Sequence, residues 1–293
     1  MSDATRCGSC GWVYWTTNYE NWGTCPKCET NNDYAPKGKK AELVSSDYIF
    51  TYMKDHIPLK IGSGLEIRYK IKERIARTKS DYQTIEIIDN PNFGKMMFLD
   101  GDLQISEADR IYDVAMNMPF LVGKGSALPE NAEIAILGGG DGGVLRELLQ
   151  NVGKVKKATL VDIDGKVIQL AKKHLRKICK GSFTDPRSEI IVGDARDFLK
   201  SGRMFDGIIY DLTMDPGNIV KMSQGHFLRD MFGRIKKCLK KGGTLSMQCC
   251  STFDKKSLRV ITKTLHMNFN DVDFRKFYIP SFCEEWVFGC CRK

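Results

Sequence analysis

The sequence of 293 residues lacks an apolar run long enough to cross a membrane, and its first residues contain no apolar stretch of the kind found in signal peptides. A spanning helix needs about 18 or more consecutive apolar residues, and a signal peptide needs a shorter apolar segment near its start. Histidine is also scarce, with four residues that form no cluster. We therefore expect a cytoplasmic protein without membrane contact, whose histidines have surface or core positions.

The 11 cysteines do not form the framework of a disulfide-rich secreted protein. Four of them make two Cys-x-x-Cys units, Cys7 with Cys10 and Cys25 with Cys28, with 14 residues between the units. Four thiolates are the donor set of a structural Zn²⁺ site, and they leave no open coordination position for a substrate. The spacing therefore predicts a zinc-ribbon-like module over residues 1–38 with a structural or interaction role. Iron is the alternative metal.

The net charge of +9 makes a nucleic acid a partner to consider. The basic residues gather in runs on expected helix faces: Lys154, Lys156, Lys157, Lys172, Lys173, Arg176, Lys177, Lys180, Lys236, Lys237, Lys240 and Lys241. Aromatic residues do not alternate with these runs, which favours solvated helix surfaces over a nucleic-acid interface. In contrast, residues 100–113 hold five acidic residues and one basic residue. This segment is either a solvated surface or an anionic wall for a polycation.

The residues Ile136–Leu149 form the segment around which the chain is organised. An apolar run ends in five glycines interrupted only by Asp141, and Val144, Leu145, Leu148 and Leu149 then follow at helical spacing. A strand, a tight glycine turn and a helix make the first unit of a nucleotide-binding sheet, with an acidic residue about 20 positions later for a ribose hydroxyl. Asp162 has that position. Asp141 would repel a pyrophosphate, so we expect a cationic ligand such as an adenosyl sulfonium carrying an amine.

From residue 133 onward, strand-like and helix-like segments alternate, which is typical of a doubly wound α/β sheet. The expected strands are 133–138, 158–162, 188–192, 206–211 and 243–249, and the expected helices are 142–151, 165–179, 221–240 and 254–267. Two more strands, 272–279 and 285–290, follow without a helix between them and predict a terminal antiparallel hairpin. This is the Rossmann-like plan of adenosylmethionine-dependent transferases. We assign it to residues 121–293, after a small β-rich domain over residues 39–120.

Acidic residues follow four consecutive expected strands: Asp141, Asp162, Asp194 and Asp211. Ligands of open α/β sheets bind at the carboxyl ends of the strands. We therefore expect these four carboxylates to belong to one binding site.

The segment Gly138–Glu147, Gly-Gly-Gly-Asp-Gly-Gly-Val-Leu-Arg-Glu, resembles the signature of the polyamine aminopropyltransferases, the spermidine and spermine synthases. Shorter segments resemble the same family in the same order: Tyr82-Gln83, Leu99-Asp-Gly-Asp102, Val161-Asp-Ile-Asp164, Gly193-Asp194 and Tyr210-Asp-Leu-Thr213. The resemblance covers residues 81–293 and leaves out the cysteine pairs. It implies transfer of an aminopropyl group from decarboxylated S-adenosylmethionine to an amine, with release of methylthioadenosine, by a homodimer or larger oligomer.

The acceptor is less sharply indicated. Three segments resemble spermine synthases: Glu107–Tyr112 by its spacing, Asp211-Leu-Thr213, and Pro280–Phe288. Gln104 and Asp215 instead match spermidine synthases, and Phe282 stands where the spermine branch has tyrosine. We predict that spermidine is converted to spermine. The alternative is a spermidine synthase with putrescine as acceptor.

The resemblance also implies roles for individual residues. The donor would be held by Gln83, Gly138, Gly140, Asp141, Asp162 and Asp194, and the acceptor by Gln104, Asp113, Asp215 and Glu284. Asp141 would hold the aminopropyl ammonium, Asp162 the ribose and Asp194 the adenine. An alkyl ammonium with a pKa of ~10 cannot attack until it loses a proton. Asp211, assisted by the Tyr112 hydroxyl, would accept that proton or orient the attacking nitrogen.

Two other classes compete with this interpretation. A nucleic-acid or protein methyltransferase would carry an Asn/Asp-Pro-Pro-Tyr type motif after the fourth strand, where this sequence has Asp211-Leu-Thr-Met. An inactive fold that acts through its metal module would not need an acidic residue at each strand end. We therefore predict an enzyme with a polyamine partner and no nucleic-acid partner.

Overall fold

A computed structural model describes residues 3–7, 9–10, 13–16, 27–28, 42–43, 55–61, 64–121, 128–213 and 222–293. The chain divides into two compact units, one of residues 1–58 with 68–71 and the other of residues 59–67 with 72–293. The division at residues 38 and 120 that we expect from the sequence stays a prediction.

The first unit contains a small antiparallel sheet with the strand order β2–β1–β3. Its strands are β1 (Asp3–Arg6), β2 (Val13–Thr16) and β3 (Glu42–Leu43). Cys7 directly follows β1 and is buried. The first cysteine pair therefore lies in the connection between two paired strands.

The β-rich segment that follows contains a hairpin and a four-stranded antiparallel sheet. The strands are β4 (His56–Ile61) and β5 (Leu65–Lys70) in the hairpin, and β6 (Glu73–Lys79), β7 (Thr84–Asn90), β8 (Gly94–Leu99) and β9 (Asp102–Ser106) in the sheet. The alternating apolar residues from Leu65 to Ile71 predict one strand over residues 65–75, and this prediction is wrong because β5 ends at Lys70 and β6 begins at Glu73. The strand breaks because the Lys72 N–H turns to the Asp89 carbonyl oxygen at 2.9 Å.

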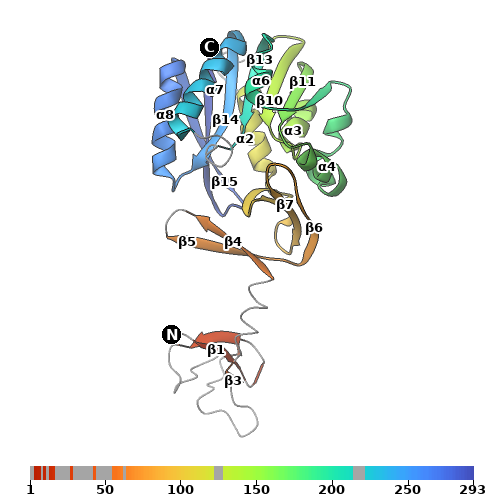
Figure 1. Cartoon of the computed structure of the whole chain (residues 1–293), viewed down its shortest axis with the longest axis vertical. Helices are drawn as coiled ribbons and strands as arrows, with labels where there is room; N and C mark the ends of the chain where they lie inside the picture. Colours follow the sequence, from red (N-terminus) through yellow and green to blue (C-terminus); the bar gives the residue numbers. More distant parts are fainter. Residues whose placement is uncertain are drawn as a thin grey trace. The chain divides into compact units, whose positions relative to one another are not determined.

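A seven-stranded sheet with the order β12–β11–β10–β13–β14–β16–β15 forms the centre of the second unit (Figure 1). Its strands are β10 (Ala132–Gly138), β11 (Val155–Asp162), β12 (Ser188–Val192), β13 (Phe205–Asp211), β14 (Leu239–Ser251), β15 (Asp271–Ile279) and β16 (Glu284–Arg292). Neighbouring strands from β12 to β14 are parallel, and β16 and β15 add an antiparallel hairpin. The predicted sheet plan is confirmed.

Seven helices in the described residues accompany this sheet. They are α2 (Arg110–Leu121), α3 (Gly143–Asn151), α4 (Gly165–His174), α5 (Arg176–Cys179), α6 (Ala195–Phe198), α7 (Gln224–Cys238) and α8 (Lys255–Asn268). The helix expected over 165–179 is divided at Leu175, whose φ of −104° and ψ of 43° are not helical. Helix α7 ends at Cys238, two residues before its expected end, because Leu239 already starts β14, four residues before the expected start of that strand.

The central strands are apolar along their whole length because helices cover both faces of the sheet. In β10, Ala135 and Leu137 pack into one core with side chains of α6, α7 and α8. The alternate residues Ile134 and Ile136 are equally inaccessible and face the other side. There, a Cβ atom at Gly207 would lie 2.4 Å from the Phe120 ring of α2. Each strand end is thereby fixed between two helix layers.

In the described part of the chain, no helix is long and apolar enough to cross a membrane.

Candidate active site

The glycine loop brings the end of β10 against the end of β13. Gly138, Gly139 and Gly142 have positive φ angles of 86°, 71° and 82°, which favour glycine. Gly138 is also the register partner of Asp211. A Cβ atom at Gly138 would lie 2.2 Å from the Asp211 carbonyl oxygen, and one at Gly139 would lie 3.1 Å from its Oδ2. The loop therefore needs glycine in order to turn and to admit the Asp211 carboxylate.

The Asp162 carboxylate connects this loop to the end of β11. The Gly140 N–H donates to Asp162 Oδ2 at 2.9 Å, and the Asp164 N–H donates to Oδ1 at 2.9 Å. Burial raises the pKa of Asp162 to about 6, although both hydrogen bonds oppose the shift. Gly140 leaves no room for a side chain, since a Cβ atom there would lie 2.6 Å from Asp162 Oδ2.

Asp141 and Asp211 complete a group of three carboxylates with raised pKa values. Asp141 Oδ1 accepts a hydrogen bond from the Gly143 N–H at 2.8 Å, and burial raises its pKa. Burial, together with the negative charge of Asp141, raises the pKa of Asp211 to about 7. None of the three forms an ion pair within the described residues. Their predicted convergence at one end of the sheet agrees with this mutual influence.

Tyr112 lies against Asp211 from helix α2. Its hydroxyl donates to Asp211 Oδ1 at 2.5 Å. The ring is buried and makes edge contacts with Phe282 and Phe288, with centroid distances of 6.2 Å and 5.3 Å. Burial and the Asp211 charge raise the pKa of Tyr112 well above its usual value, so the hydroxyl keeps its proton. Asp211 Oδ2 lies beside Gly139 and forms no hydrogen bond with another residue that the structure describes.

Asp113, on the next position of α2, is enclosed in the protein. Arg146 Nη2 donates to Asp113 Oδ2 at 2.7 Å, and the same guanidinium donates to the Ile178 carbonyl oxygen at 2.6 Å. Asp113 Oδ1 has no hydrogen-bond partner among the described residues, and burial raises the pKa well above its usual value. In this arrangement Asp113 joins α2 to α3 beneath the glycine loop.

Glu284 lies at the start of β16 and is buried. It accepts a hydrogen bond from Ser251 Oγ, and burial raises its pKa. The neighbouring Trp286 donates from Nε1 to Gln248 Oε1 at 3.0 Å, and Gln248 Nε2 donates to the Leu212 carbonyl oxygen at 2.8 Å. This chain of contacts connects Glu284's strand with the residue that follows Asp211.

Phe282 closes the same region from the turn between β15 and β16. Its ring contacts Tyr112 on one side and Trp286 on the other, at a centroid distance of 5.0 Å from the latter. The turn is fixed by Asp109, whose carboxylate accepts from the Ser281 N–H at 2.9 Å and from the Ser106 N–H at 2.7 Å. Tyr112, Phe282 and Trp286 thus form a row of contacting aromatic rings that begins at Asp211.

The remaining predicted site residues differ in how they are engaged. Gln83 Nε2 donates to Asp164 Oδ2 at 3.0 Å, and Ser80 Oγ donates to the same oxygen at 2.6 Å. Asp194 caps α6 and pairs with Arg196 at 2.8 Å, which lowers its pKa. Gln104 is exposed and donates to the Asp102 carbonyl oxygen of its own strand at 3.0 Å. Asp215 lies outside the described residues.

Ser80 and Asp164 hold Gln83 in place, and the sequence reasoning gave them no role. Asp164 also accepts from the Lys166 N–H at 3.0 Å and thereby caps α4. An aspartate directly before a helical pattern is a local capping signal. Its contact with Ser80, 84 residues away, has no such local signal.

Three of the four predicted metal ligands come together in the first unit. The sulfur atoms of Cys7, Cys10 and Cys28 all lie within 4.8 Å of one another, and those of Cys7 and Cys28 are 3.6 Å apart. The Ser9 N–H donates to Cys7 Sγ at 3.4 Å. Cys25 lies outside the described residues. The three sulfurs fit part of a thiolate zinc site.

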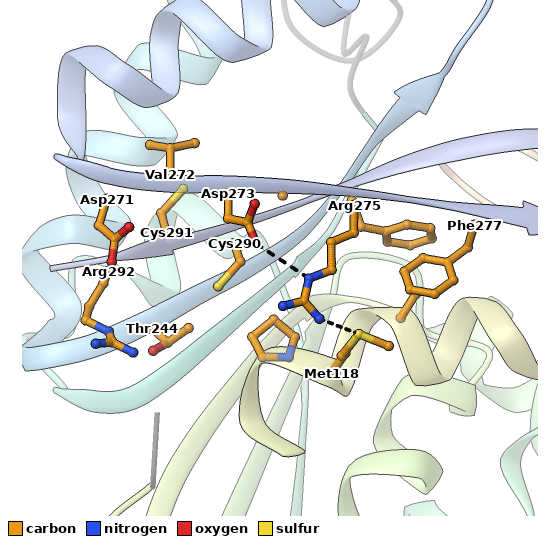
Figure 2. A pocket seen from close by; sticks show the side chains of 14 residues that line it. Met118, Thr244, Asp271, Val272, Asp273, Arg275, Phe277, Cys290, Cys291 and Arg292 are labelled. Carbon is orange, nitrogen blue, oxygen red and sulfur yellow. Dashed lines mark hydrogen bonds and ion pairs between the residues drawn. The ribbon is translucent and has the colours of Figure 1, made fainter. Parts of the chain in front are cut away.

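A cavity of about 530 Å³ lies elsewhere, between α2 and the β15–β16 hairpin (Figure 2). The Arg275 guanidinium crosses it, where Nη1 donates to Met118 Sδ at 2.8 Å and Nε lies 3.5 Å from Asp273 Oδ2. None of the predicted site residues lines this cavity. The carboxylate group around Asp211 carries the chemistry, so we place the candidate active site there.

Comparisons with known proteins find related sequences over most of the chain. Residues 117–293 match the family model of the spermine/spermidine synthase domain, and residues 56–107 match that of the spermidine synthase tetramerisation domain. The chain is 34% identical over 212 residues to a polyamine aminopropyltransferase of Pyrobaculum aerophilum, covering 70% of each protein. It is 32% identical over 211 residues to one of Korarchaeum cryptofilum, covering 71% of this chain and 62% of that relative.

Crystal structures give the same result for the fold. The chain is similar to a spermidine synthase in complex with the transition state analogue AdoDATO, with a TM-score of 0.69 and 28% identity over 78% of this chain and 77% of that one. It is equally similar to the spermidine synthase from Thermotoga maritima, with a TM-score of 0.69 and 28% identity. The predicted Rossmann-like fold is confirmed.

Proposed function

Because the chain belongs to the spermidine and spermine synthase family of polyamine aminopropyltransferases, we propose that it transfers the aminopropyl group of decarboxylated S-adenosylmethionine to a polyamine and releases methylthioadenosine. The observation that carries this proposal is the group of Asp141, Asp162 and Asp211, three carboxylates with raised pKa values beside one glycine loop. Burial disfavours their charged forms. A sulfonium donor and an ammonium acceptor restore those charges by pairing with them.

On the donor side, Asp141 pairs with the aminopropyl ammonium, and Asp162 accepts hydrogen bonds from the ribose hydroxyls. Asp194 receives the adenine amino group, and Gln83, already held by Asp164, contributes a polar edge. The carboxylate of intact S-adenosylmethionine would meet the Asp141 carboxylate. Like charges about 4 Å apart in a partly buried site repel by several kcal/mol, so the site selects the decarboxylated donor.

The transfer is a direct displacement in which the acceptor nitrogen attacks the carbon next to the sulfonium. The nitrogen must first lose a proton, and its ammonium pKa is ~10. Transfer to an ordinary aspartate would be uphill by about 6 pKa units, or ~8 kcal/mol. With the pKa of Asp211 at about 7, the gap falls to about 3 units, or ~4 kcal/mol. Tyr112 occupies Oδ1, so Oδ2 is the oxygen that orients the nitrogen and takes its proton.

We propose spermidine as the acceptor, with putrescine as the alternative. The buried Glu284 provides a second carboxylate away from Asp211, and Phe282 and Trp286 provide apolar surface between them. A triamine extends farther than a diamine and therefore gains more from such a distal anion. Gln104, Asp113 and Asp215 were further acceptor candidates, of which Asp113 is already paired with Arg146.

Product analysis tests the acceptor. Purified protein is given decarboxylated donor with putrescine or with spermidine in separate reactions, and the amines are separated by chromatography. We expect spermine from spermidine, and we expect Glu284→Gln to raise the KM for spermidine more than that for putrescine. Formation of spermidine from putrescine, with no spermine from spermidine, would reverse the acceptor assignment and leave the aminopropyl transfer intact.

We propose in addition that Cys7, Cys10, Cys25 and Cys28 bind one structural Zn²⁺. The proximity of three of these sulfurs supports this proposal, and a small module of this kind gains its folding free energy from the metal. Elemental analysis of purified protein should find one zinc per chain. Cys10→Ser should lower that content, whereas Cys283→Ser, a matched exposed cysteine in the transferase unit, should leave it unchanged.

We also propose that the protein is a homo-oligomer. A dimer is what the family resemblance implies, and the match of residues 56–107 to a tetramerisation domain supports an assembly through this segment. Light scattering coupled to size-exclusion chromatography distinguishes a dimer from a tetramer. A monomer at micromolar concentration would contradict both.

A further inference from the structure

The end of the sheet opposite the active site is basic. Parallel strands all begin at this end, and basic residues stand within two residues of their first positions: Lys154, Lys156, Lys157, Arg203, Lys237, Lys240 and Lys241. They outnumber the acidic residues Glu130, Glu189 and Asp206, which form ion pairs with four of them. The C-terminal Lys293 lies here too, because its N–H donates to the Gly243 carbonyl oxygen at 3.0 Å (Figure 1). The carboxylates at the other end bind cations, so the two ends suit ligands of opposite charge.

A hollow of about 560 Å³ opens at this basic end, between residues 199–204 and one side of α7. Five basic residues and one acidic residue line it: Lys200, Arg203, Arg229, Asp230, Arg234 and Lys237. Its size lies within the range of about 300 to 1,000 Å³ that is usual for ligand sites. We call it the basic hollow.

Part of the wall of the basic hollow is held rigidly by ion pairs. Arg203 Nη2 lies 2.9 Å from Glu189 Oε2, and its guanidinium stands over the Phe198 ring at 5.5 Å. Arg234 Nε donates to both carboxylate oxygens of Asp230, at 2.9 Å and 2.8 Å. These guanidinium groups keep fixed positions, and their remaining N–H groups can donate to an anion.

Arg229 and Lys237 are the cations left for a ligand. Both are exposed, and neither forms an ion pair within the described residues. With Gly233 they stand four residues apart along α7, so all three lie on one side of the helix. A glycine weakens a helix relative to alanine, and a Cβ atom at Gly233 would meet nothing within 4 Å. No packing contact requires this glycine, and it leaves open space between the two cations.

The sequence alone predicts no nucleic-acid partner, because aromatic residues are absent from the basic runs. Contacts to phosphates need no aromatic residues, and we propose that the basic hollow binds the phosphate backbone of a nucleic acid, without regard to base sequence. The cations continue beyond the hollow to Lys241 and Lys293 along the sheet end, while Lys240 between them pairs with Asp206 at 2.8 Å. A row of cations suits a chain of phosphates better than a single small anion. No aromatic side chain lines the hollow, so bases are not stacked there. The binding leaves the active site accessible, because the two sites are at opposite ends of the strands.

Fluorescence anisotropy of a labelled RNA of about 20 nucleotides, titrated with the full-length protein, tests this proposal. We expect binding that weakens with salt, because each neutralised phosphate of a single strand contributes about −0.7 to the slope of log K against log salt. Arg229→Glu with Lys237→Glu should weaken binding at least tenfold. Gly233→Leu should also weaken it, because the side chain fills the space between the cations without changing a charge.

The matched control is Lys173→Glu with Arg176→Glu, which makes the same charge change at exposed residues near the end of α4 and in α5. It should keep the RNA affinity within about twofold, and all variants should keep aminopropyl transfer, which shows that they fold. Equal weakening by this control would overturn the location. Full affinity in Gly233→Leu would exclude the hollow itself. Competition by ATP as effective as competition by unlabelled RNA would show a small-anion site and overturn the nucleic-acid assignment.

Discussion

Carboxylates at the two ends of the parallel sheet have opposite electrostatic surroundings. At the carboxyl ends of the strands, burial raises the pKa values of Asp162 and Asp211 to about 6 and about 7. At the other end, Glu189 accepts hydrogen bonds from Lys157, Thr159 and Arg203, and these lower its pKa to about 2. The cations around Glu189 stabilise the folded protein without a ligand. Asp162 and Asp211 have no cation beside them among the described residues, so we expect a ligand to supply the positive charge.

Asp194 is the exception at the active-site end. Arg196 pairs with it at 2.8 Å and lowers its pKa. The adenine that we assign to this residue is neutral, so the site needs no unpaired charge there. Asp194, which we assign to a neutral group, is thus paired with a cation of the protein. Asp141 and Asp211, which we assign to cationic groups, are not.

Among substitutions at the two ends of the sheet, replacing Asp211 should reduce turnover the most. Asp211→Asn removes the proton acceptor, and we expect kcat to fall by about 10² to 10⁴-fold. Binding of methylthioadenosine, measured by the shift in melting temperature, should persist because this product lacks the acceptor amine. Asp185→Asn, which removes a carboxylate paired with Arg187 at 2.9 Å, should turn over at the wild-type rate. Wild-type turnover in Asp211→Asn would refute its role.

Asp141→Asn should have the next largest effect, and it should act on the donor. Losing a charge-assisted hydrogen bond costs about 1.5 to 3 kcal/mol, so the KM for decarboxylated donor should rise about 10- to 100-fold. The variant should also bind intact S-adenosylmethionine better than the wild type does, because the repulsion between carboxylates is gone. Calorimetric titration with both donors measures this selectivity. An unchanged ratio of the two affinities would contradict the assignment.

The local parts of this site could be predicted from the sequence. The strand, glycine loop and helix around Asp141 are specified by consecutive residues, and parallel strands necessarily bring Asp162 and Asp211 to the same end. Contacts between distant segments could not be predicted. The pairing of Asp113 with Arg146 depends on how α2 packs against α3, and that of Ser80 with Asp164 depends on how the strand before Gln83 meets α4.

The expected strand over 65–75 failed for a related reason. Its alternating apolar residues fit one continuous strand, yet the Ile71 N–H donates to the Asp55 carbonyl oxygen at 2.7 Å and the Lys72 N–H to Asp89. The N–H groups of two consecutive residues thus bond to different segments of the chain. A hydrophobic pattern indicates which face is buried, and it does not show where a strand changes its partner.

The pH dependence of donor binding tests whether the carboxylates at the active-site end become ionised when the donor binds. The pKa values of Asp162 and Asp211 are raised to about 6 and about 7, so the folded protein holds these protons more tightly than the unfolded chain. Their contribution to stability is therefore full below about pH 4 and is lost as the pH rises through 6 and 7. The ammonium of the donor pairs with ionised Asp141, whose pKa is also raised by burial. The donor affinity should therefore increase as the pH rises, by up to about tenfold for each pH unit, until this carboxylate is ionised.

Methylthioadenosine is the control for this experiment because it lacks the sulfonium and the ammonium. The ratio of its Kd to that of the decarboxylated donor should grow between pH 5.5 and pH 8. A ratio that does not change with pH would mean that the carboxylates are already ionised before the donor binds.

The smallest effect should come from Glu189 at the other end of the sheet. Its side chain is 33% exposed, and ion pairs at such positions contribute about 0.2 to 1 kcal/mol. Glu189→Gln should therefore lower the free energy of unfolding by no more than about 1 kcal/mol at pH 7, without changing turnover. The pKa is lowered from 4.5 to about 2, so the stabilisation is complete above about pH 4.5 and is lost as the pH falls through 2. Urea unfolding of both proteins at pH 7 and near pH 2.5 should show this difference shrinking. A loss of turnover in Glu189→Gln would mean that the two ends of the sheet are coupled. It would contradict the view that Glu189 acts only on stability and the carboxylates at the other end only on catalysis.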